Sequence, residues 1–300
     1  MNNTVELLKR EFKNNQNVIV SENVPMNKYT TFKTGGIAAG AVFPTDTESM
    51  RRTLEILNGT KYSVLGNGSN VIFTDGKYDG VVVFTLNMKD TRVDGNMLEV
   101  QCGAGITRAS VVAQKHSLGG LEFAYGIPGT AGGAVYMNAG AYDGEISQVL
   151  YDSTFITKDG NVGILSAEQH EFSYRHSAYV NSDKIILSCR FCLTESDADA
   201  VKAKMDENMS KRIEKQPLEY PSAGSVFKRP ENAFAGKLIS DCGLKGYAIG
   251  GAQVSPKHAG FIINTGNATS NDILKLIEYV RNEVIRQFGI ELECEVRYIC

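Results

Sequence analysis

The sequence lacks a long hydrophobic run. None of its apolar stretches approaches 18 residues, the length at which a helix could span a bilayer. The N-terminal stretch MNNTVELLKREFKNN is polar and lacks the apolar core of a secretory signal peptide. We therefore expect a cytoplasmic protein that does not cross a membrane.

The sequence also lacks an excess of positive charge and the residue spacing of a metal site. Lys and Arg number 31 against 34 Asp and Glu, a net charge of −3, which does not predict a surface for nucleic acid or other polyanions. The only close cysteine pair is Cys189 and Cys192, and no second pair completes a zinc site. Reduced cysteines with a structural role are the simplest interpretation, so we expect no metal and no nucleic-acid partner.

Glycine is abundant, yet the usual phosphate-binding fingerprints are missing. Three stretches are rich in glycine: GNGSN at 66–70, GAG at 103–105 and GIPGTAGGAVYMNAGAYDGE at 126–145. No Gly-Lys-Ser/Thr follows them, which excludes a P-loop. Neither GxG continues to GxxG, which excludes the dinucleotide fingerprint of a Rossmann unit. Tight turns in a strand-rich domain are the simplest interpretation of any one stretch.

Three such stretches in one region favour a second interpretation. Successive backbone N–H groups in turns form anion-binding nests without a lysine. Side chains of Ser69, Asn70, Thr130 and Asn138 would add further donors. We therefore predict that a large flat ligand with a pyrophosphate lies along this backbone.

Hydrophobic patterning divides the chain into two parts. Up to about residue 195, short strands dominate, with helices expected at 45–58 and 106–116. Beyond it we expect a long charged helix at 197–216 and amphipathic helices at 233–243 and 270–289. The expected strands lie within 61–73, 80–86, 97–105, 151–157, 184–191, 260–264 and 291–299. The change in character places a domain boundary near 195–215.

The last helix carries the clearest periodicity. Ile273, Ile277, Val280 and Val284 share one face, and Gly289 is the expected C-cap.

Six motifs occur in a fixed order along the chain. They are YTTFKTGG (29–36), LGNGSNVIF (65–73), EFAYGIPGTAGGAVYMNAGAYDGE (122–145), FSYRHSAY (172–179), PSAGSVFKRP (221–230) and GIELECEVRYI (289–299). Together they resemble the UDP-N-acetylenolpyruvoylglucosamine reductases, over about residues 25–300. One motif alone is a weak signal, whereas six in order at matching spacing are specific.

The resemblance implies an α+β fold with two domains. Residues 1–200 would form an FAD-binding domain of the vanillyl-alcohol-oxidase (PCMH) type, built of two α+β lobes. Residues 201–300 would form a smaller α+β substrate-binding domain.

The resemblance also implies two half-reactions in peptidoglycan precursor synthesis, and so a role in cell-wall biogenesis, cell shape and division. NADPH reduces FAD, and hydride then passes to UDP-N-acetylglucosamine enolpyruvate, which gives UDP-N-acetylmuramate. Residues 60–75 contain no histidine, so we expect noncovalent FAD, with His116 as a less favoured alternative tether. A monomer is expected. The sequence does not decide between NADPH and NADH.

Three catalytic residues follow from the resemblance. Hydride addition leaves enolate-like charge beside the carboxylate, which needs cationic or acidic partners and then a proton. The family match assigns the proton donor to Ser225, charge stabilisation to Arg175 and a second acidic partner to Glu295. A turn hydroxyl at Ser225, a surface ion pair at Arg175 and a solvated strand face at Glu295 are the structural alternatives.

The resemblance assigns thirteen residues to the cofactor and three to the substrate. Those for FAD are Thr34, Gly66, Asn67, Gly68, Ser69, Asn70, Gly126, Gly129, Thr130, Gly132, Gly133, Asn138 and Gly140. Those for the substrate are Tyr142, Lys215 and Lys228. Arg229 and His258 stand where other members carry polar amides, so the same contacts are not assigned to them.

Local charge supports a diphosphate substrate independently of the resemblance. Residues 211–237 hold six Lys or Arg and three Glu, a local charge of +3, while the rest of the chain carries −6. A solvated helix end is the alternative interpretation.

One departure from the family pattern concerns the loop that covers the bound substrate in some members. Forty-nine residues separate Arg175 from Ser225, too few for the inserted tyrosine loop of some members. The chain therefore resembles the short, type II form.

Two other functions stay open. One is a different flavin oxidase or dehydrogenase on the same fold, which would consume oxygen without the enolpyruvyl substrate. The other is a nucleotide-binding protein without turnover.

Overall fold

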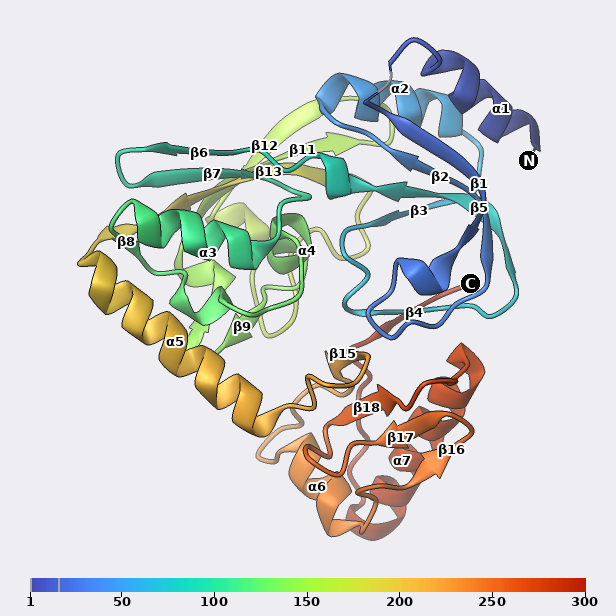
Figure 1. Cartoon of the computed structure of the whole chain (residues 1–300), viewed down its shortest axis with the longest axis vertical. Helices are drawn as coiled ribbons and strands as arrows, with labels where there is room; N and C mark the ends of the chain where they lie inside the picture. Colours follow the sequence, from blue (N-terminus) through green and yellow to red (C-terminus); the bar gives the residue numbers. More distant parts are fainter. Residues whose placement is uncertain (1, 16) are drawn as a thin grey trace. The chain divides into compact units, whose positions relative to one another are not determined.

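The structure is a computed structural model that describes residues 2–15 and 17–300, with the backbone alone for Asn2. The chain divides into two compact units (Figure 1). Unit 1 consists of Met1–Asn23, Ala39–Asn67 and Asp79–Lys211. Unit 2 consists of Val24–Ala38, Gly68–Tyr78 and Arg212–Cys300. This division differs from a single cut at residue 200, because two early segments belong to the second unit. The cofactor and substrate roles of the expected domains stay predictions.

Unit 1 contains two main sheets. Its helices are α1 (Asn2–Glu11), α2 (Thr47–Leu57), α3 (Ile106–Lys115), α4 (Ala131–Tyr136) and most of α5 (Ala198–Lys215), whose residues 212–215 belong to unit 2. The four-stranded sheet has the order β1 (Ile19–Pro25), β2 (Ile37–Phe43), β5 (Lys77–Phe84), β3 (Tyr62–Leu65). The five-stranded sheet has the order β12 (Val162–Ser166), β11 (Leu150–Thr157), β13 (Lys184–Cys192), β7 (Met97–Gln101), β6 (Thr91–Asp94). The short strands β8 (Leu118–Gly119) and β14 (Thr194–Glu195) pair with each other, as do β9 (Gly140–Ala141) and β10 (Gly144–Glu145).

One hydrophobic core joins the elements of unit 1. Leu8 of α1, Leu54 of α2 and Val83 of β5 belong to the same buried cluster as Val100 of β7 and Phe191 of β13. All five are at most 1% exposed. Burial of such side chains stabilises each by about 1.5–3 kcal/mol, so the core and not local propensity fixes the two sheets.

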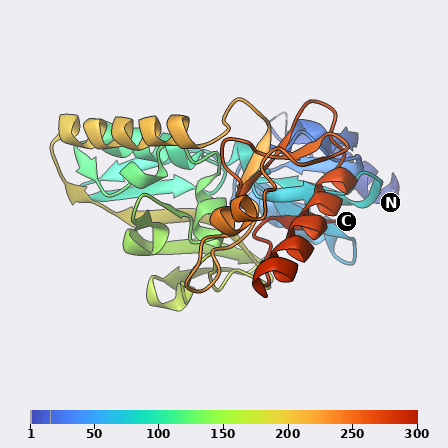
Figure 2. The same ribbon diagram turned by 90° about the horizontal axis from the view of Figure 1, so that it is seen from below.

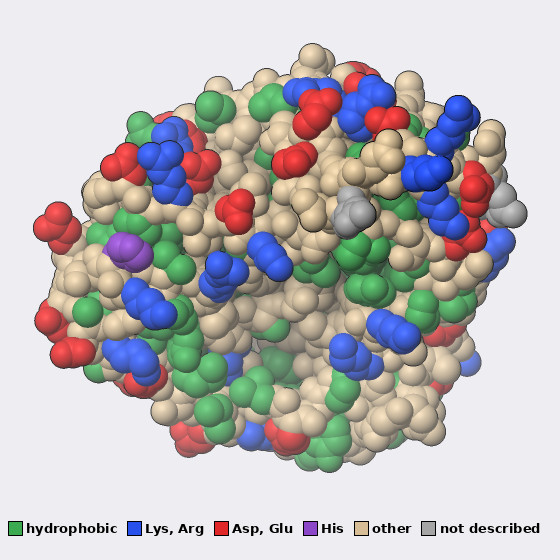
Figure 3. Space-filling model, turned by 45° about the horizontal axis from the view of Figure 1, so that its top comes forward, with side chains coloured by type: hydrophobic (Ala, Val, Ile, Leu, Met, Phe, Trp, Pro, Cys, Tyr) green, Lys and Arg blue, Asp and Glu red, His purple; other side chains and the backbone are tan. Residues whose placement is uncertain are grey.

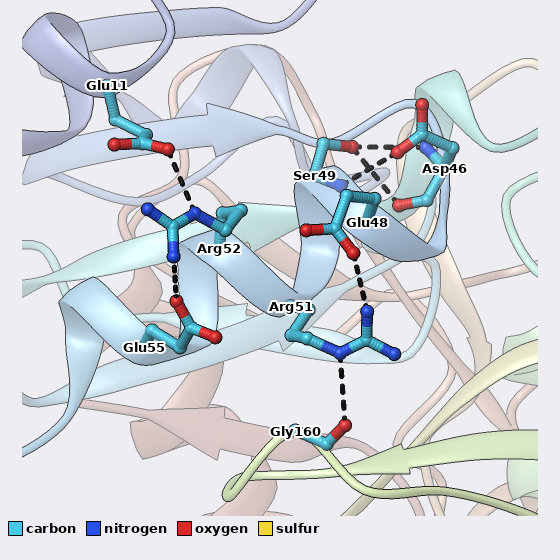
Figure 4. A network of polar contacts seen from close by, with 8 residues as sticks. All are labelled: Glu11, Asp46, Glu48, Ser49, Arg51, Arg52, Glu55 and Gly160. Carbon is cyan, nitrogen blue, oxygen red and sulfur yellow. Dashed lines mark hydrogen bonds and ion pairs between the residues drawn. The ribbon is translucent and has the colours of Figure 1, made fainter.

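Helix α2 shows how local sequence sets an element. Asp46 caps its N-terminus, since the Asp46 carboxylate accepts from Ser49 N at 2.7 Å. On its exposed face Arg52 pairs with Glu11 and Glu55 (Figure 4). Arg51 Nε donates to Gly160 O at 3.3 Å, which links the helix to the β11–β12 turn.

Unit 2 is a four-stranded antiparallel sheet with helices. The sheet order is β15 (Ser222–Ser225), β18 (Phe261–Asn264), β17 (Ala252–Val254), β16 (Ala248–Ile249). Helix α7 (Ser270–Phe288) packs on β16 and β17, and α6 (Ala235–Asp241) packs on α7 (Figure 2). A parallel pair joins β4 (Val71–Phe73) and β19 (Arg297–Ile299).

Long-range hydrogen bonds attach the two early segments to unit 2. Asn264 Nδ2 donates to Phe32 O at 2.9 Å. The Asp75 carboxylate accepts from Ser270 N and Asn271 N at 2.8 Å each, at the first turn of α7. An acidic group at a helix N-terminus is favoured by the orphan N–H groups and the helix dipole.

Most expected helices are confirmed. Residues 45–58, 106–116, 197–216, 233–243 and 270–289 correspond to α2, α3, α5, α6 and α7. The predicted face of α7 is buried, and Gly289 ends the helix at φ +68°. Helices α1 and α4 were not expected.

The expected strand at 291–299 is only partly formed. β19 covers Arg297–Ile299, while residues 293–295 pair with 226–228 through a single bridge. The burial nevertheless alternates, with Glu291 and Glu293 exposed and Glu295 half-buried.

Among the residues that the structure describes, no helix is long and apolar enough to cross a membrane. The same residues contain no cluster of His, Cys, Asp and Glu that could hold a metal ion. Basic and acidic side chains alternate over much of the face in Figure 3.

Candidate functional site

The glycine stretches of unit 1 converge in space. Ile106 N donates to Gly129 O at 3.0 Å and Ala131 N to Ala104 O at 2.8 Å, which joins the second stretch to the third. Asn67 Nδ2 donates to Pro128 O at 2.5 Å, which joins the first stretch to the third. The structure therefore brings residues 66–67, 103–105 and 126–133 together in unit 1.

Several of these glycines are explained by chain packing. A Cβ on Gly66 would lie 2.3 Å from Thr130 Oγ1, and one on Gly103 would lie 1.8 Å from Thr85 O. A Cβ on Gly132 would lie 2.8 Å from that of Cys102. In unit 2, a Cβ on Gly68 would lie 2.1 Å from Tyr29 O, and Gly68 has φ +59°. The simple interpretation, tight turns and close packing, thus accounts for these four positions.

Some polar groups near the stretches remain for a ligand. In the described part of the chain, no hydrogen bond is donated by the backbone N–H groups of residues 66–70. In unit 2, Thr34 is 3% exposed and its Oγ1 has no hydrogen-bond partner. A buried unpaired hydroxyl is costly unless a ligand satisfies it. Within unit 2, the free N–H groups of residues 68–70 and the orphan hydroxyl of Thr34 fit the phosphates and polar ring edges of a dinucleotide such as FAD.

The other predicted cofactor residues differ in how their side chains are used. Thr130 Oγ1 caps α4 by accepting from Gly133 N at 3.3 Å. In unit 2, Asn70 Nδ2 donates to Glu295 O at 3.1 Å, while Ser69 is half-buried. For the remaining glycines, Gly126, Gly129 and Gly140, only the backbone is available to a ligand, and a cofactor contact stays a prediction.

Arg175 lies in a tight turn of unit 1. Ser173 N donates to His176 O at 3.3 Å and His176 N to Ser173 O at 3.1 Å, which closes the turn. Arg175 has φ +55°, and its Nη2 donates to Gly140 O at 3.3 Å. Its guanidinium lies 5.3 Å from the centre of the Tyr174 ring. Arg175 therefore lies against the third glycine stretch.

Tyr142 lies at the tip of a two-residue hairpin in the same stretch. Ala141 pairs with Gly144 and Gly140 with Glu145, which leaves Tyr142 and Asp143 as the loop. Their φ angles are +51° and +63°, the values of a type I′ turn. Five of the ten described non-glycine residues with positive φ lie between Asn138 and Arg175. Backbone strain of this kind concentrates at functional sites.

Ser225 and Glu295 are brought together in unit 2. Ser225 is paired with Phe261 at a bulge in β15 that follows Gly224, whose φ is +76°. Glu295 N donates to Val226 O at 2.7 Å, which sets Glu295 beside the residue after Ser225. Both residues are half-buried. Bulges of this type re-aim side chains next to active sites.

One predicted substrate residue of unit 2, Lys228, lies close to this pair. Lys228 N donates to Glu293 O at 2.9 Å, and the Lys228 ammonium pairs with the Glu293 carboxylate at 2.6 Å. Lys215 is exposed and is the last residue of α5. The Arg229 guanidinium lies 4.0 Å above the centre of the Phe234 ring.

His258 flanks the strand that pairs with Ser225. Its Nδ1 accepts from Gly260 N at 3.1 Å, and Val226 N donates to Gly260 O. Burial lowers the pKa of His258, so the imidazole is neutral near pH 7.

A buried network behind the Arg175 turn was missed by sequence reasoning. Ser153 Oγ lies 2.8 Å from His170 Nε2 and 2.6 Å from the Tyr179 hydroxyl. His170 O accepts from Ala178 N at 2.7 Å, which ties the network to the end of the turn. Burial lowers the pKa of His170 and raises that of Tyr179, so both stay neutral. The one signal in the sequence is that Tyr179 is the last residue of the FSYRHSAY motif and His170 lies two residues before it.

Two family models match the chain. One describes an FAD binding domain and matches residues 38–166. The other describes the C-terminal domain of UDP-N-acetylenolpyruvoylglucosamine reductase and matches residues 216–299.

Curated relatives match almost the whole chain. The UDP-N-acetylenolpyruvoylglucosamine reductase of Clostridium botulinum (strain Okra / Type B1) is 51% identical over 287 residues, which cover 95% of this chain and 93% of the relative. The enzyme of that name from Pediococcus pentosaceus is 48% identical, with 94% and 95% covered.

Among solved structures, the UDP-N-acetylenolpyruvylglucosamine reductase from Thermus caldophilus matches with a TM-score of 0.81 and 31% identity. The match covers 94% of this chain and 99% of that chain. The expected fold class, an FAD-binding domain followed by a smaller α+β domain, is confirmed by this match together with the family models. The oxidoreductase class is confirmed with it, and the chain belongs to the UDP-N-acetylenolpyruvoylglucosamine reductase family.

Proposed function

We propose that this chain reduces UDP-N-acetylglucosamine enolpyruvate to UDP-N-acetylmuramate in peptidoglycan precursor synthesis, with NADPH as reductant and noncovalent FAD. Two observations carry the proposal: the family match over 95% of the chain, and the hydrogen bond from Glu295 N to Val226 O, which sets Glu295 beside the residue after Ser225 in unit 2.

FAD fits the residues available for it. Thr34, with its orphan buried hydroxyl, and the backbone N–H groups of residues 66–70 would hold the cofactor. When bound, FAD supplies hydride transfer. The remaining steps belong to the chain's own side chains.

Ser225 donates the proton to the carbon beside the substrate carboxylate. A hydroxyl suits this role because the enolate-like intermediate is a strong base, and because the sequence beside Ser225 shows neither a GxSxG elbow nor a His–Asp pair that would make the serine a nucleophile. The irregularity between Ser222 and Ser225 in β15 supports this role, since bulges of this type are common next to active sites.

Arg175 and Glu295 stabilise the charge that develops on the substrate. A guanidinium stays protonated and binds a carboxylate through two parallel N–H bonds. Half-burial of Glu295 separates it from the exposed Glu291 and Glu293, which supports a role inside a site. Tyr142, Lys215 and Lys228 contact the substrate in this proposal.

The finer assignments rest on the family and on composition. We propose a cytoplasmic monomer that binds NADPH and the enolpyruvyl nucleotide in turn. The basic segment 211–237 supports binding of a diphosphate.

The visible spectrum of the purified protein tests this proposal. Under anaerobic conditions, NADPH should bleach the flavin band and UDP-N-acetylglucosamine enolpyruvate should restore it. A band that bleaches and does not return would indicate another dehydrogenase on the same fold. Absence of any band after addition of FAD would contradict a flavoenzyme.

A further inference from the structure

Asn138 joins two segments of unit 1 that carry predicted site residues. It is 1% exposed and lies at the base of the hairpin that presents Tyr142. Its Nδ2 donates to Ser173 O at 3.2 Å, inside the Arg175 turn. Its Oδ1 accepts from Ser147 N at 2.9 Å, on the far side of the hairpin. The amide therefore bridges the hairpin and the turn.

The turn holds a conformation that is unfavourable for its sequence. Two backbone bonds between Ser173 and His176 close it, and Arg175 occupies the left-handed region. A non-glycine residue is strained in that region, so the turn persists only where its surroundings impose it. Asn138 contacts the turn on its N-terminal side, and Ser177 Oγ, which donates to Tyr136 O at 2.8 Å, anchors its C-terminal side.

We propose that Asn138 is a positioning residue: its carboxamide holds the Arg175 turn against the Tyr142 hairpin and so sets where the Arg175 guanidinium lies. This inference rests on the proposed function of Arg175. It also gives Asn138 a different role from the flavin contact expected from sequence, because both ends of its side chain are bonded within the chain.

The test uses the FAD-loaded enzyme and five variants. Asn138→Gly removes the amide and, at φ +43°, introduces no backbone strain. The reoxidation rate of reduced flavin by the enolpyruvyl substrate should fall about 10- to 100-fold, as expected for a misplaced catalytic group. In an Arg175→Ala background, the same change should have less than a twofold effect. Equal fold-losses in both backgrounds would overturn the proposal.

Ser110→Ala is the matched control. It removes a buried donor to a backbone carbonyl, Ser110 Oγ to Leu121 O at 2.8 Å, elsewhere in unit 1. Its reoxidation rate should equal that of the wild type. A fall as large as that of Asn138→Gly would mean that any lost buried hydrogen bond has this effect, and the positioning role would be rejected.

A second readout does not depend on activity. Amide hydrogen exchange across residues 172–178 should accelerate in Asn138→Gly and not in Ser110→Ala. Where the Gly variant fails to fold, Asn138→Asp keeps an acceptor for Ser147 N and replaces the donor to Ser173 O by a carboxylate oxygen, which repels that carbonyl. If wild-type flavin is not reoxidised by the enolpyruvyl substrate, the proposed function fails, and the exchange result alone decides whether Asn138 positions the turn. Unchanged exchange would overturn it.

Discussion

Gly66 has no room for a side chain, so the effect of its packing against Thr130 on the stability of the protein can be measured by substitution. A Cβ at Gly66 would lie 2.3 Å from Thr130 Oγ1, whereas ordinary contact begins at 3.4 Å. One of the two segments must therefore move by about 1 Å. Thr130 is 3% exposed and caps α4, so it has no free volume to enter. Overpacking of this kind should lower the free energy of unfolding by about 1–3 kcal/mol in Gly66→Ala.

A double-mutant cycle isolates this contact. Thr130→Ala alone should lower the free energy of unfolding by about 1 kcal/mol through loss of the cap. In Gly66→Ala/Thr130→Ala the clashing Oγ1 and Cγ2 are gone, and only a 3.2 Å contact to Cβ remains. The double variant should therefore be about as stable as Thr130→Ala.

Urea unfolding of the cofactor-free protein, followed by circular dichroism because the chain has no tryptophan, measures the cycle. Gly105→Ala is the control, since nothing lies within 4 Å of its Cβ and its φ is −60°. Gly105 is the N-cap of α3, where Ala is a poorer cap than Gly, so the stability of this variant should fall by no more than about 1 kcal/mol. Additive losses for Gly66 and Thr130, or an equal loss for Gly105→Ala, would refute the packing argument.

Four further predictions concern catalysis, pH and thiol chemistry. Ser225→Ala should leave flavin reduction by NADPH intact and slow reoxidation by the enolpyruvyl substrate about 10²- to 10⁴-fold in stopped-flow traces; equal loss in both half-reactions would contradict the proton-donor role. Arg175→Ala should harm reoxidation more than reduction, and unchanged turnover would remove it from the site. Burial lowers the pKa of His170 from 6.5, so below about pH 6.5 the unfolded chain binds more protons than the folded chain. The free energy of unfolding should therefore decrease as the pH is lowered, and His170→Gln should make this decrease smaller. Burial raises the pKa of Cys102 to about 12, so Ellman's reagent at pH 8 should label exposed Cys192 and leave Cys102 unlabelled until urea is added.

The elements that the sequence predicted carry their signals locally. Helix α2 begins at an Asp46 cap, and α7 lies between a Thr269 cap and Gly289. Short-range rules of capping and periodicity are sufficient for both. Helix α4 lies inside the glycine stretch, where helix propensity is low, and is formed by packing of Gly132 on Cys102 and by the Thr130 cap.

Which chain segments form each of the two units could not be predicted from sequence patterns. Segments 24–38 and 68–78 belong to unit 2 because Asn264 reaches Phe32 and Asp75 reaches the start of α7. These partners are about 200 residues apart in sequence, and no periodicity or turn signal links them. A boundary placed by composition near 195–215 therefore locates the start of the last segment, at Arg212, and misses the other two.

The same limit applies to the site. The motifs identify Ser225 and Glu295, but their proximity comes from one backbone bond, Glu295 N to Val226 O. Asn138 was expected to bind the cofactor because an amide in a glycine stretch is a good donor. Only the structure shows that Ser147 and Ser173 already use both ends of that amide.

Backbone strain adds an argument that neither motif nor fold supplies. A chain that needed only a tight hairpin at 141–144 would be most stable with Asn-Gly in its type I′ loop. Tyr142 and Asp143 occupy it instead, and Arg175 occupies another left-handed position in the turn that bonds to Gly140. Each such residue costs about 1–2 kcal/mol, against a total stability of about 5–15 kcal/mol for a typical domain. Non-glycine side chains at such strained positions are best explained by contacts that they make with a bound substrate. This supports a substrate role for Tyr142 and Arg175, and it is consistent with the proposal that Asn138 positions the Arg175 turn.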